Sequence, residues 1–257
     1  MYRARVMPVL QLDDIGLVKT KRFGKSVYVG DPTNAVRIFN DKEVDELILV
    51  ETTATTANRL PNFELLEEVV SESFVPVTYA GGVHCLEHLE KLFRIGIEKV
   101  GMGTAALENP DLVRQAAKQF GNQSIAVTID VKRNWRGIYT CWIRGGREKI
   151  AGSPLEIAER MEQLGAGEIL LTSIDREGTF SGYDLDLVRS VANGISIPVV
   201  ANGGAASLED LRQVVQEAGA SAAAAGSLFV FHGKHRAVLI NFPPPTQLDA
   251  LLRPRAA

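Results

Sequence analysis

A repeat with a nearly constant offset is the feature of this 257-residue sequence that most restricts its fold. Three motifs of the first half recur in the second: Val75-Pro76-Val77 with Gly81-Gly82 as Ile197-Pro198-Val199 with Gly203-Gly204, residues 46–49 as 168–171, and Gly103-Thr104 as Gly226-Ser227. The first two pairs lie 122 residues apart and the third 123. Parallel strands resemble one another in any protein, but that likeness does not produce one offset across three separated motifs. The repeat therefore indicates two equivalent halves.

Short β-branched runs alternate with amphipathic stretches along the chain. We expect strands at residues 5–12, 46–52, 75–79, 98–101, 124–132, 168–173, 197–201 and 222–226. We expect helices at residues 32–42, 62–73, 85–95, 109–119, 154–164, 185–192 and 208–217. This alternation requires βαβ crossovers and a parallel sheet, and strands that are apolar throughout fit a sheet covered on both faces. Two halves of four such units predict an α/β protein, a closed (β/α)8 TIM barrel with half-barrel internal duplication, rather than an open doubly wound sheet.

A barrel of this kind takes about 250 residues, so we expect a single domain over residues 1–257. Residues 134–147 alternate in period two around Gly137, which predicts a β-hairpin inserted after the fifth strand. The run Pro243-Pro244-Pro245 cannot lie inside a helix. We therefore expect an irregular proline-rich tail over residues 241–257, a turn or two of helix at most within 246–252, and an eighth helix that is short, displaced or lost.

Composition excludes several classes of protein. A net charge of -3 gives no reason to expect nucleic acid or an anionic membrane as a partner. No apolar run approaches the roughly 20 residues of a membrane helix, and the N-terminus lacks a signal peptide's apolar block. Two cysteines, Cys85 and Cys141, suit a reducing compartment. We expect a soluble cytoplasmic protein.

No cofactor or metal is expected from the sequence. His84 and His88 are four residues apart, but the first is not followed directly by a glutamate as in the H-E-x-x-H pattern of zinc proteases, so we interpret them as surface residues of the third helix. His232 and His235 flank a glycine loop and have no evident partners.

The site of such a barrel lies at the C-terminal ends of its strands, and the repeat places glycine-rich turns there. Glycine lets backbone N–H groups approach an anion, and a helix N-terminus behind the turn adds favourable partial charge. The duplicated turns predict two phosphate sites on opposite sides of the barrel; the alternative is that the glycines only permit tight turns. The loop after residues 168–173 is also typical of a ligand site, because it carries charges, hydroxyls and glycines: Asp175, Arg176, Glu177, Gly178, Thr179 and Ser181.

Two strand ends and one loop carry candidate catalytic groups. Asp130 ends the fifth strand, where a carboxylate can act as a general acid or base, or instead can cap the strand or pair with a neighbouring basic residue. Its repeat mate on the first strand is Gln11, an amide that can only form hydrogen bonds. Lys19 falls in a flexible basic loop that is either solvated surface or a lid that closes on phosphate.

Charged residues also stand at the opposite end of the barrel. Four of them stand at or near the start of a strand, just before an apolar run: Arg5, Glu46, Lys99 and Glu168. Charges at strand starts are usually solvated. Two positive and two negative residues at one barrel mouth can instead form a closed ring of ion pairs.

The most specific stretches are GAGEILLTSIDREGTFSGYD (165–184), TAALENPDL (104–112) and VTIDVKR (127–133). On these the chain resembles the HisF family, the cyclase subunit of imidazole glycerol phosphate synthase, over residues 5–231. The resemblance implies a half-duplicated barrel, a substrate with two phosphates, and ammonia that comes from a glutaminase (HisH-like) subunit on the N-terminal face and passes along the barrel axis. It implies phosphate roles for Gly82, Thr104, Gly178, Gly204 and Ser227, and for Gly226, which directly precedes Ser227. It implies a lid role for Lys19, a catalytic role for Asp130, and an ammonia gate of Arg5, Glu46, Lys99 and Glu168.

Several positions depart from the family pattern. Gln11 stands where the family has its first catalytic aspartate; Gly103, Glu51 and Asn202 replace an asparagine, an aspartate and a serine. Loss of one acid–base partner typically costs about 10²–10⁴ in rate. Asp13 faces the same way as Gln11 if the strand continues, but we expect the strand to have ended before it.

Residues 27–47 and 227–243 resemble a HisF-like branch found in surface-polysaccharide gene clusters beside a glutaminase-like protein and an N-acetyl sugar amidotransferase. That branch is associated with converting an acetamido sugar into an acetamidino sugar. The hypothesis is therefore a barrel subunit that takes ammonia from a glutaminase and supports amidation of an N-acetyl sugar, with the sugar amidotransferase as a further partner. The alternatives are a working cyclase of histidine biosynthesis and a non-catalytic scaffold that activates a partner.

Overall fold

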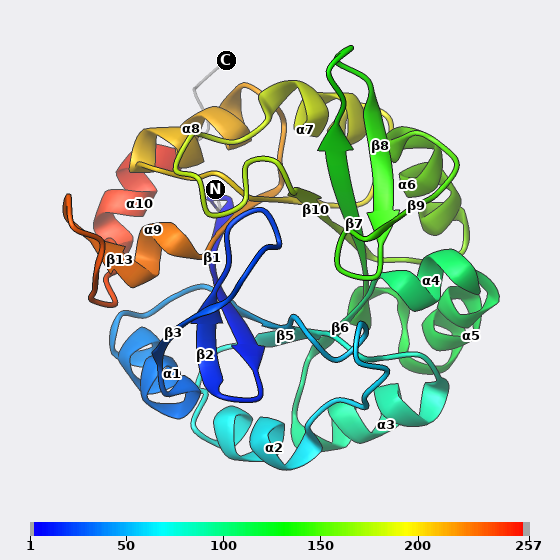
Figure 1. The fold of residues 1–257 in the computed structure, drawn as a ribbon, viewed down its shortest axis with the longest axis horizontal. Helices are drawn as coiled ribbons and strands as arrows, with labels where there is room; N and C mark the ends of the chain where they lie inside the picture. Colours follow the sequence, from blue (N-terminus) through cyan, green and yellow to red (C-terminus); the bar gives the residue numbers. More distant parts are fainter. Residues whose placement is uncertain (1–2, 254–257) are drawn as a thin grey trace.

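A closed barrel of parallel strands forms the centre of the molecule in the computed structural model, which describes residues 3–253 (Figure 1). The barrel strands pair side by side in this order: β1 (Arg5–Asp13), β4 (Leu47–Glu51), β5 (Val77–Ala80), β6 (Lys99–Met102), β7 (Ile125–Arg133), β10 (Glu168–Ser173), β11 (Val199–Asn202) and β12 (Ala222–Ala225). β12 pairs with β1, with Arg5 opposite Ala222, and so closes the cylinder. The predicted TIM barrel is confirmed.

Amphipathic helices form the outer ring around these strands (Figure 1). They are α1 (Pro32–Asp41), α2 (Phe63–Ser71), α3 (Leu86–Ile95), α5 (Asp111–Phe120), α6 (Pro154–Gln163), α7 (Leu185–Ala192) and α8 (Leu208–Gln216). Local chemistry starts most of them, because a side-chain oxygen at the N-cap accepts a backbone N–H bond from the first turn. The capping residues are Asp31, Asn62, Ser153, Asp184 and Ser207.

Two short helices follow the repeated glycine turns and were not predicted. α4 (Thr104–Glu108) comes directly after β6, and α9 (Ser227–Val230) comes directly after β12. Gly103 and Gly226 are their N-cap residues. The repeat therefore extends to local structure, since each duplicated Gly-Thr or Gly-Ser pair begins one turn of helix.

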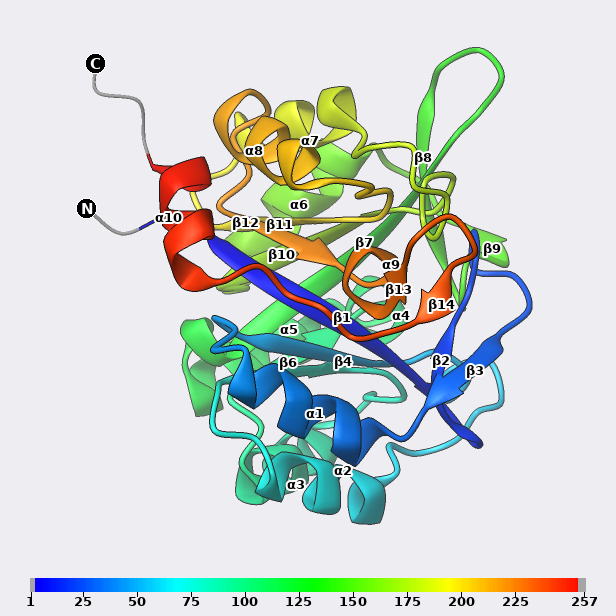
Figure 2. The ribbon, with the colours of Figure 1, turned by 90° about the vertical axis from the view of Figure 1, so that its left-hand side faces the viewer.

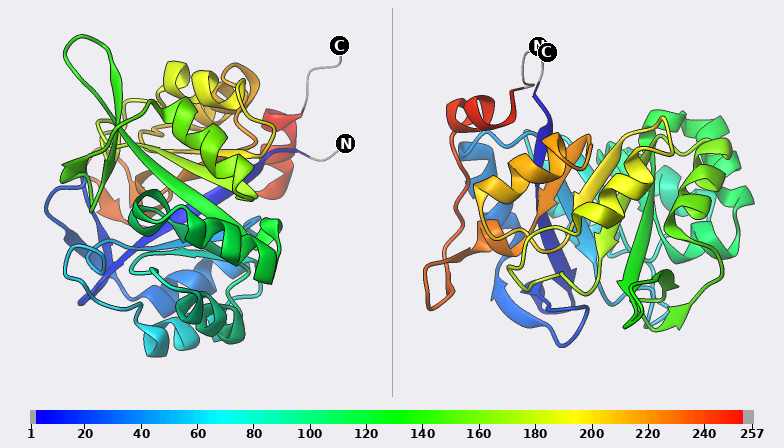
Figure 3. Two further views of the ribbon diagram at one scale, coloured as in Figure 1. Left: turned by 90° about the vertical axis from the view of Figure 1, so that its right-hand side faces the viewer. Right: turned by 90° about the horizontal axis from the view of Figure 1, so that it is seen from above.

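Antiparallel extensions cover the C-terminal end of the barrel. β2 (Gly16–Lys19) folds back on β1, with Val18 opposite Gln11, and pairs with β3 (Val27–Gly30). β8 (Tyr139–Ile143) folds back on β7 and is followed by β9 (Glu148–Lys149). The views of Figures 2 and 3 place both extensions at the end toward which β1 runs, and the loop of the β7–β8 hairpin projects from the body.

The C-terminal segment contains one short helix. α10 (Pro245–Leu252) supplies the turn or two of helix expected within residues 246–252, and it begins one residue earlier, at the third proline of the run. Proline is compatible with the first turn of a helix, where its missing N–H would have no helical partner. α10 packs beside α8 at the end of the barrel opposite to β2 and β3 (Figure 2). Residues 254–257 of the expected tail lie outside the described residues.

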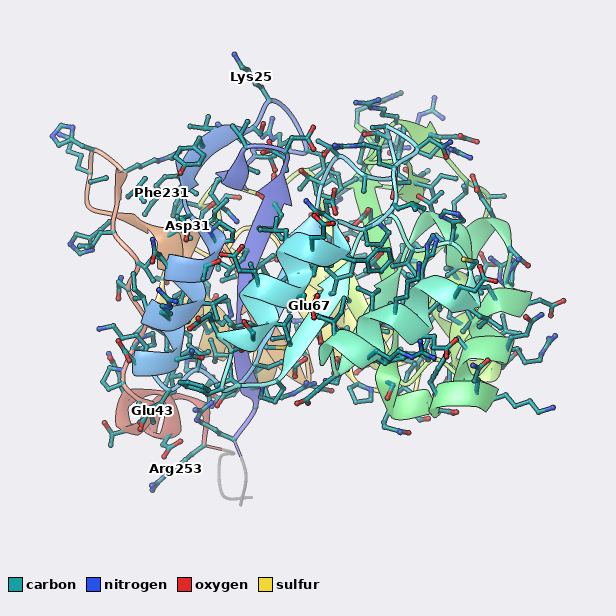
Figure 4. All side chains as sticks on the ribbon, turned by 90° about the horizontal axis from the view of Figure 1, so that it is seen from below. Lys25, Asp31, Glu43, Glu67, Phe231 and Arg253 are labelled. Atoms are coloured by element: carbon teal, nitrogen blue, oxygen red, sulfur yellow. The ribbon has the colours of Figure 1, made fainter. Side chains whose placement is uncertain are left out.

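A small hairpin precedes α10: β13 (Phe231–His232) pairs with β14 (Ala237–Val238). Side chains mark the two ends of the barrel (Figure 4): Lys25 of the β2–β3 loop lies at one end, and Glu43 and Arg253 lie at the other. No helix among residues 3–253 is long and apolar enough to cross a membrane.

The hydrophobic core has two parts. The larger part fills the layer between strands and helices, and a smaller one fills the barrel interior with Met7, Val9, Ile48, Leu170, Val200, Ala222 and Ala224. In the outer layer the fully buried ring of Phe39 meets Phe242 edge-on at 6.4 Å, and Phe242 lies 4.9 Å from Phe229. These rings attach the segment after α9 to α1.

Replacing Phe39 with alanine tests this attachment. We expect Phe39→Ala to lower the free energy of unfolding by about 3–5 kcal/mol, because a fully buried ring leaves a cavity. The matched control is Phe74→Ala, whose ring is 86% exposed, with an expected change within about 0.5 kcal/mol. Urea unfolding followed by circular dichroism measures both. Equal losses in the two variants would show that the Phe39 contact contributes little.

Candidate functional site

The four charged residues at the N-terminal end of the barrel form a closed ring of ion pairs. Arg5 pairs with Glu46 at 2.5 Å and with Glu168, and Lys99 pairs with Glu46 at 3.0 Å and with Glu168 at 3.2 Å. Both glutamates are buried, and Thr78 donates a 2.6 Å hydrogen bond to Glu46. Two carboxylates in such a place need cationic partners, because an unpaired buried charge is costly. The usual expectation of solvated strand starts does not hold here.

An apolar interior follows this ring along the barrel axis. Met7, Ile48 and Leu170 lie two residues after Arg5, Glu46 and Glu168 on their strands, and alternate strand residues point to the same side. Leu170, with Val9 and Val50, also lines a cavity of ≈ 380 Å³ at the C-terminal end. The ring and the cavity are thus opposite ends of one interior.

The predicted phosphate residues divide between two adjoining hollows. Gly82 and Thr104 line the large cavity, together with Gln11, Glu51 and Asp130. The other four line a smaller neighbouring pocket: Gly178, Gly204, Gly226 and Ser227. Val9, Gln11 and Asn202 line both. The two halves of the repeat therefore place their glycine turns on either side of Gln11.

Asp130 lies partly buried at the C-terminal end of β7, where it lines the large cavity. Burial raises the pKa of its carboxyl to about 7, and a hydrogen bond with Thr172 opposes this rise. A carboxyl with such a pKa can both accept and donate a proton near neutral pH, as a general acid–base catalyst needs.

Gln11 is held in a polar network rather than facing the cavity with free groups. Its amide Nε2 donates to Glu177 Oε1 at 3.2 Å, and its Oε1 accepts the backbone N–H of Thr20 at 3.0 Å. Glu177 also accepts bonds from the Thr20 hydroxyl and the Phe23 backbone N–H. The buried carboxylate beside Gln11 thus belongs to Glu177. From the sequence alone, Glu177 is only one of several polar residues in the loop after residues 168–173.

Asp13 does not take the place of a carboxylate at Gln11. β1 does continue to Asp13, contrary to the expectation that it ends earlier. Asp13 nevertheless accepts hydrogen bonds from the Ile15 backbone N–H and the Ser26 hydroxyl, and it does not line the cavity that Gln11 and Asp130 share.

Lys19 is neither in a flexible loop nor solvated, which corrects both the predicted setting and the surface alternative. It ends β2, it is 4% exposed, and its Nζ donates to the Val9 carbonyl at 3.2 Å. Burial lowers its pKa to about 8, and the charge of Glu177 opposes this. The ammonium lies directly over Gly226, where an added Cβ would meet Nζ at 2.0 Å. A cation therefore occupies the smaller pocket beside Ser227.

At least one glycine of the two pockets also has a structural role. Gly178 has φ +68°, and a Cβ there would meet the Thr20 carbonyl oxygen at 2.4 Å. That glycine is therefore required for the packing of its loop against β2. On the other side, the Thr104 hydroxyl accepts the Arg144 backbone N–H at 3.0 Å, so the β8–β9 turn closes over the large cavity.

The histidines of α3 differ from expectation in one respect. His84 is exposed and lines the large cavity, but His88 is buried, so its assignment to the surface is wrong. Its ring packs edge-on against Phe63 and His84. The i,i+4 spacing brings both rings to one side of the N-terminal turn of α3.

Comparisons with known proteins agree over nearly the whole chain. A family model described as "Histidine biosynthesis protein" matches residues 5–236. A Pseudomonas aeruginosa protein named "Putative imidazole glycerol phosphate synthase subunit hisF2" is 50% identical over 97% of this chain and 99% of its own. The imidazole glycerol phosphate synthase subunit HisF of Alkaliphilus metalliredigens is 38% identical over 90% of this chain and 92% of its own.

The raised pKa of Asp130 makes stability depend on pH. The pKa of the Asp130 carboxyl is about 7 in the folded chain and 3.8 ordinarily, so the folded chain holds the proton more tightly. The resulting contribution to the free energy of unfolding is fully present below pH 3.8 and is lost as pH rises through about 7. Asp130→Asn stays neutral, so the difference in free energy of unfolding between this variant and the wild type should shift in favour of the variant from about pH 4 to about pH 8. Urea unfolding at several pH values measures this gain. The exposed Asp41→Asn control should show none, and a flat difference for Asp130→Asn would contradict the assignment.

The ion-pair ring makes a second prediction. Lys99→Met leaves two buried carboxylates with Arg5 as their remaining cation, so we expect a loss of about 1–3 kcal/mol in the free energy of unfolding. Arg94→Met removes an exposed partner of Glu90, and its expected effect is about 0.5 kcal/mol or less. Similar small effects in both variants would mean that solvent screens the ring.

Proposed function

Because the chain belongs to the histidine biosynthesis protein family as a HisF-like barrel subunit of the imidazole glycerol phosphate synthase type, we propose that it receives ammonia from a glutaminase and supports an amidation reaction. The acceptor is an N-acetyl sugar of surface-polysaccharide biosynthesis, and an N-acetyl sugar amidotransferase is a further partner. The replacement of the first carboxylate by Gln11 is the observation that carries this proposal over histidine biosynthesis.

The ion-pair ring supports the ammonia route. It stands at the barrel end opposite to the cavity, and apolar side chains follow it along the axis. A glutaminase (HisH-like) subunit docked on this end would release ammonia at Arg5, Glu46, Lys99 and Glu168. A neutral ammonia molecule passes an apolar interior more easily than ammonium does, because burying a charge is costly. Opening of the ring admits it.

The cavity end supports chemistry that differs from ring closure. Asp130 is suited to one proton transfer, whereas cyclisation in this family implies two carboxylates on opposite strands. Gln11 supplies hydrogen bonds to Glu177 and Thr20 and cannot take a proton. In this proposal Asp130 is the acid–base group, Gln11 positions the loop of Glu177, and Lys19 binds an anionic group of the ligand.

The divided pockets support a phosphorylated small-molecule ligand. Gly82 and Thr104 on one side and Gly204, Gly226 and Ser227 on the other are joined through the shared wall at Gln11. Lys19 adds a positive charge to the second side, and the backbone turns add N–H donors. A phosphate on either side of the reacting centre would fix its orientation.

A working cyclase is the second candidate, and one contact favours it. The buried carboxylate of Glu177 lies 3.2 Å from the Gln11 amide nitrogen, so it could act as the second acid–base group. The non-catalytic scaffold remains the third candidate. It predicts that Asp130→Asn leaves the activity of the complex unchanged, whereas both enzymatic candidates predict a loss of about 10²–10⁴.

The decisive experiment is the ammonia-dependent cyclase assay. The purified protein receives the bisphosphorylated intermediate of histidine biosynthesis and ammonium salt, and the formation of imidazole glycerol phosphate is followed. We expect turnover at least about 10²-fold below a typical enzyme range of roughly 1–10³ s⁻¹. Turnover within that range would establish the cyclase instead.

A reciprocal variant sharpens this test. Gln11→Asp restores the missing carboxylate, so it should raise cyclase turnover by about 10²-fold or more if the cavity still binds the substrate. Gln11→Asn is the matched control, because asparagine has the size of aspartate but no acidic group. It should not raise cyclase turnover. A Glu177→Gln variant that abolishes wild-type turnover would assign the second carboxylate to Glu177 and favour the cyclase.

A further inference from the structure

A cluster of metal-ligating side chains lies at the start of α3, directly after the Gly81-Gly82 turn. One ligand atom each of His84, Cys85 and His88 lies within 4.8 Å of the other two. The two imidazole rings stand edge-to-face with centroids 4.3 Å apart. Among residues 3–253 this is the one such group of three or more histidine, cysteine or acidic residues.

The backbone of the β5–α3 turn positions the first two side chains. Cys85 is the N-cap residue of α3, but its side chain makes no capping bond, so the thiol is not used to begin the helix. His84 Nδ1 lies 3.1 Å from the Gly82 carbonyl oxygen. An N–H donated there leaves Nε2 as the free acceptor. Histidine ligands of metals commonly donate their other ring N–H to a carbonyl in this way, which fixes the tautomer.

His88 supplies the independent sign of a missing partner. The residue is 7% exposed, and its Nδ1 is buried without a hydrogen bond of good geometry among the described residues, although the Gly82 carbonyl lies near the ring. Buried polar atoms are nearly always paired, so an unpaired ring nitrogen inside a group of potential ligands requires an explanation. A metal ion would provide the partner.

We propose that His84, Cys85 and His88 bind a zinc ion, with the fourth coordination position open toward the large cavity. Two imidazole nitrogens and one thiolate form a ligand set that suits borderline-soft divalent zinc. Three protein ligands with one open position are typical of sites that hold water or a substrate group, whereas structural sites are filled by four. His84 and Gly82 also line the cavity that contains Asp130, so the open position adjoins it.

The surroundings of the cluster permit this charge. The carboxylate of Glu87 lies 3.9 Å from the Cys85 Sγ and offsets part of the ion's positive charge. The ammonium of Lys91, 5.3 Å from the centroid of the Phe63 ring, acts in the opposite sense, because it disfavours positive charge at His88. Binding releases the Cys85 thiol proton to solvent, because the thiolate is the ligand.

Cobalt(II) is the spectroscopic probe for this site in the full-length, metal-free protein. One equivalent should give the charge-transfer band of a cobalt–thiolate bond and the intense visible bands of tetrahedral coordination, and zinc should abolish both by displacement. Cys85→Ser should lose the charge-transfer band. His84→Ala and Cys85→Ser should each weaken zinc binding at least by the roughly 10–100-fold that even a second-shell loss costs. His235→Ala is the matched control, an exposed histidine outside the cluster that should bind normally.

A second measurement needs no variant. The sequence has two cysteines, and Cys141 is fully buried, so alkylation of the native protein reports Cys85. Zinc should suppress this alkylation, because a thiolate bound to the metal is not free to react, and removal of zinc by a chelator should restore the rate. The same cobalt spectrum in Cys85→Ser, or an alkylation rate that zinc leaves unchanged, would overturn the proposal. Neither readout depends on the amidation reaction, so failure here leaves the proposed function untouched.

Discussion

The pairing of β12 with β1 is the constraint on which the rest of the molecule depends. Once the parallel strands close into a cylinder, alternate residues on every strand must face the axis. On β1 this rule sets Arg5, Met7, Val9 and Gln11 in one line from the N-terminal mouth to the cavity. A shift of β1 by one residue would turn its charged and polar side chains toward the helices. The pairing of the strands and the burial of charge therefore require the same register.

The two ends of this line treat charge in different ways. At the N-terminal mouth the buried carboxylates of Glu46 and Glu168 share two cations, so no charge is left unpaired. At the cavity end, burial raises the pKa of Asp130 and lowers that of Lys19, because fewer partners compensate their charges. The paired charges of the ring stabilise the N-terminal mouth, whereas the shifted pKa values of Asp130 and Lys19 make these groups reactive. Groups with strongly shifted pKa values cluster at functional sites.

Internal duplication accounts for much of the site but also for its asymmetry. Both halves begin a short helix after a glycine turn, at Thr104 and at Ser227. Lys19 of the first half lies over the Gly226 turn of the second half, and among residues 3–253 the histidine and cysteine cluster occurs only in the first half. The symmetric backbone therefore supplies two similar anion-binding sides, and side chains outside the repeat make them different.

The barrel and the approximate positions of its strands followed from the sequence alone, because the constant offset of the repeat, the apolar runs and the helical patterns can all be read from the residues. β10 and α7 have the expected bounds, and the ring of Arg5, Glu46, Lys99 and Glu168 was among the alternatives weighed. Tertiary structure decided what sequence could not: the burial of Lys19 on β2, the bond between Gln11 and Glu177, and the burial of His88. Each of these depends on contacts between segments far apart in the chain, and such contacts leave no periodic trace in the residues that make them.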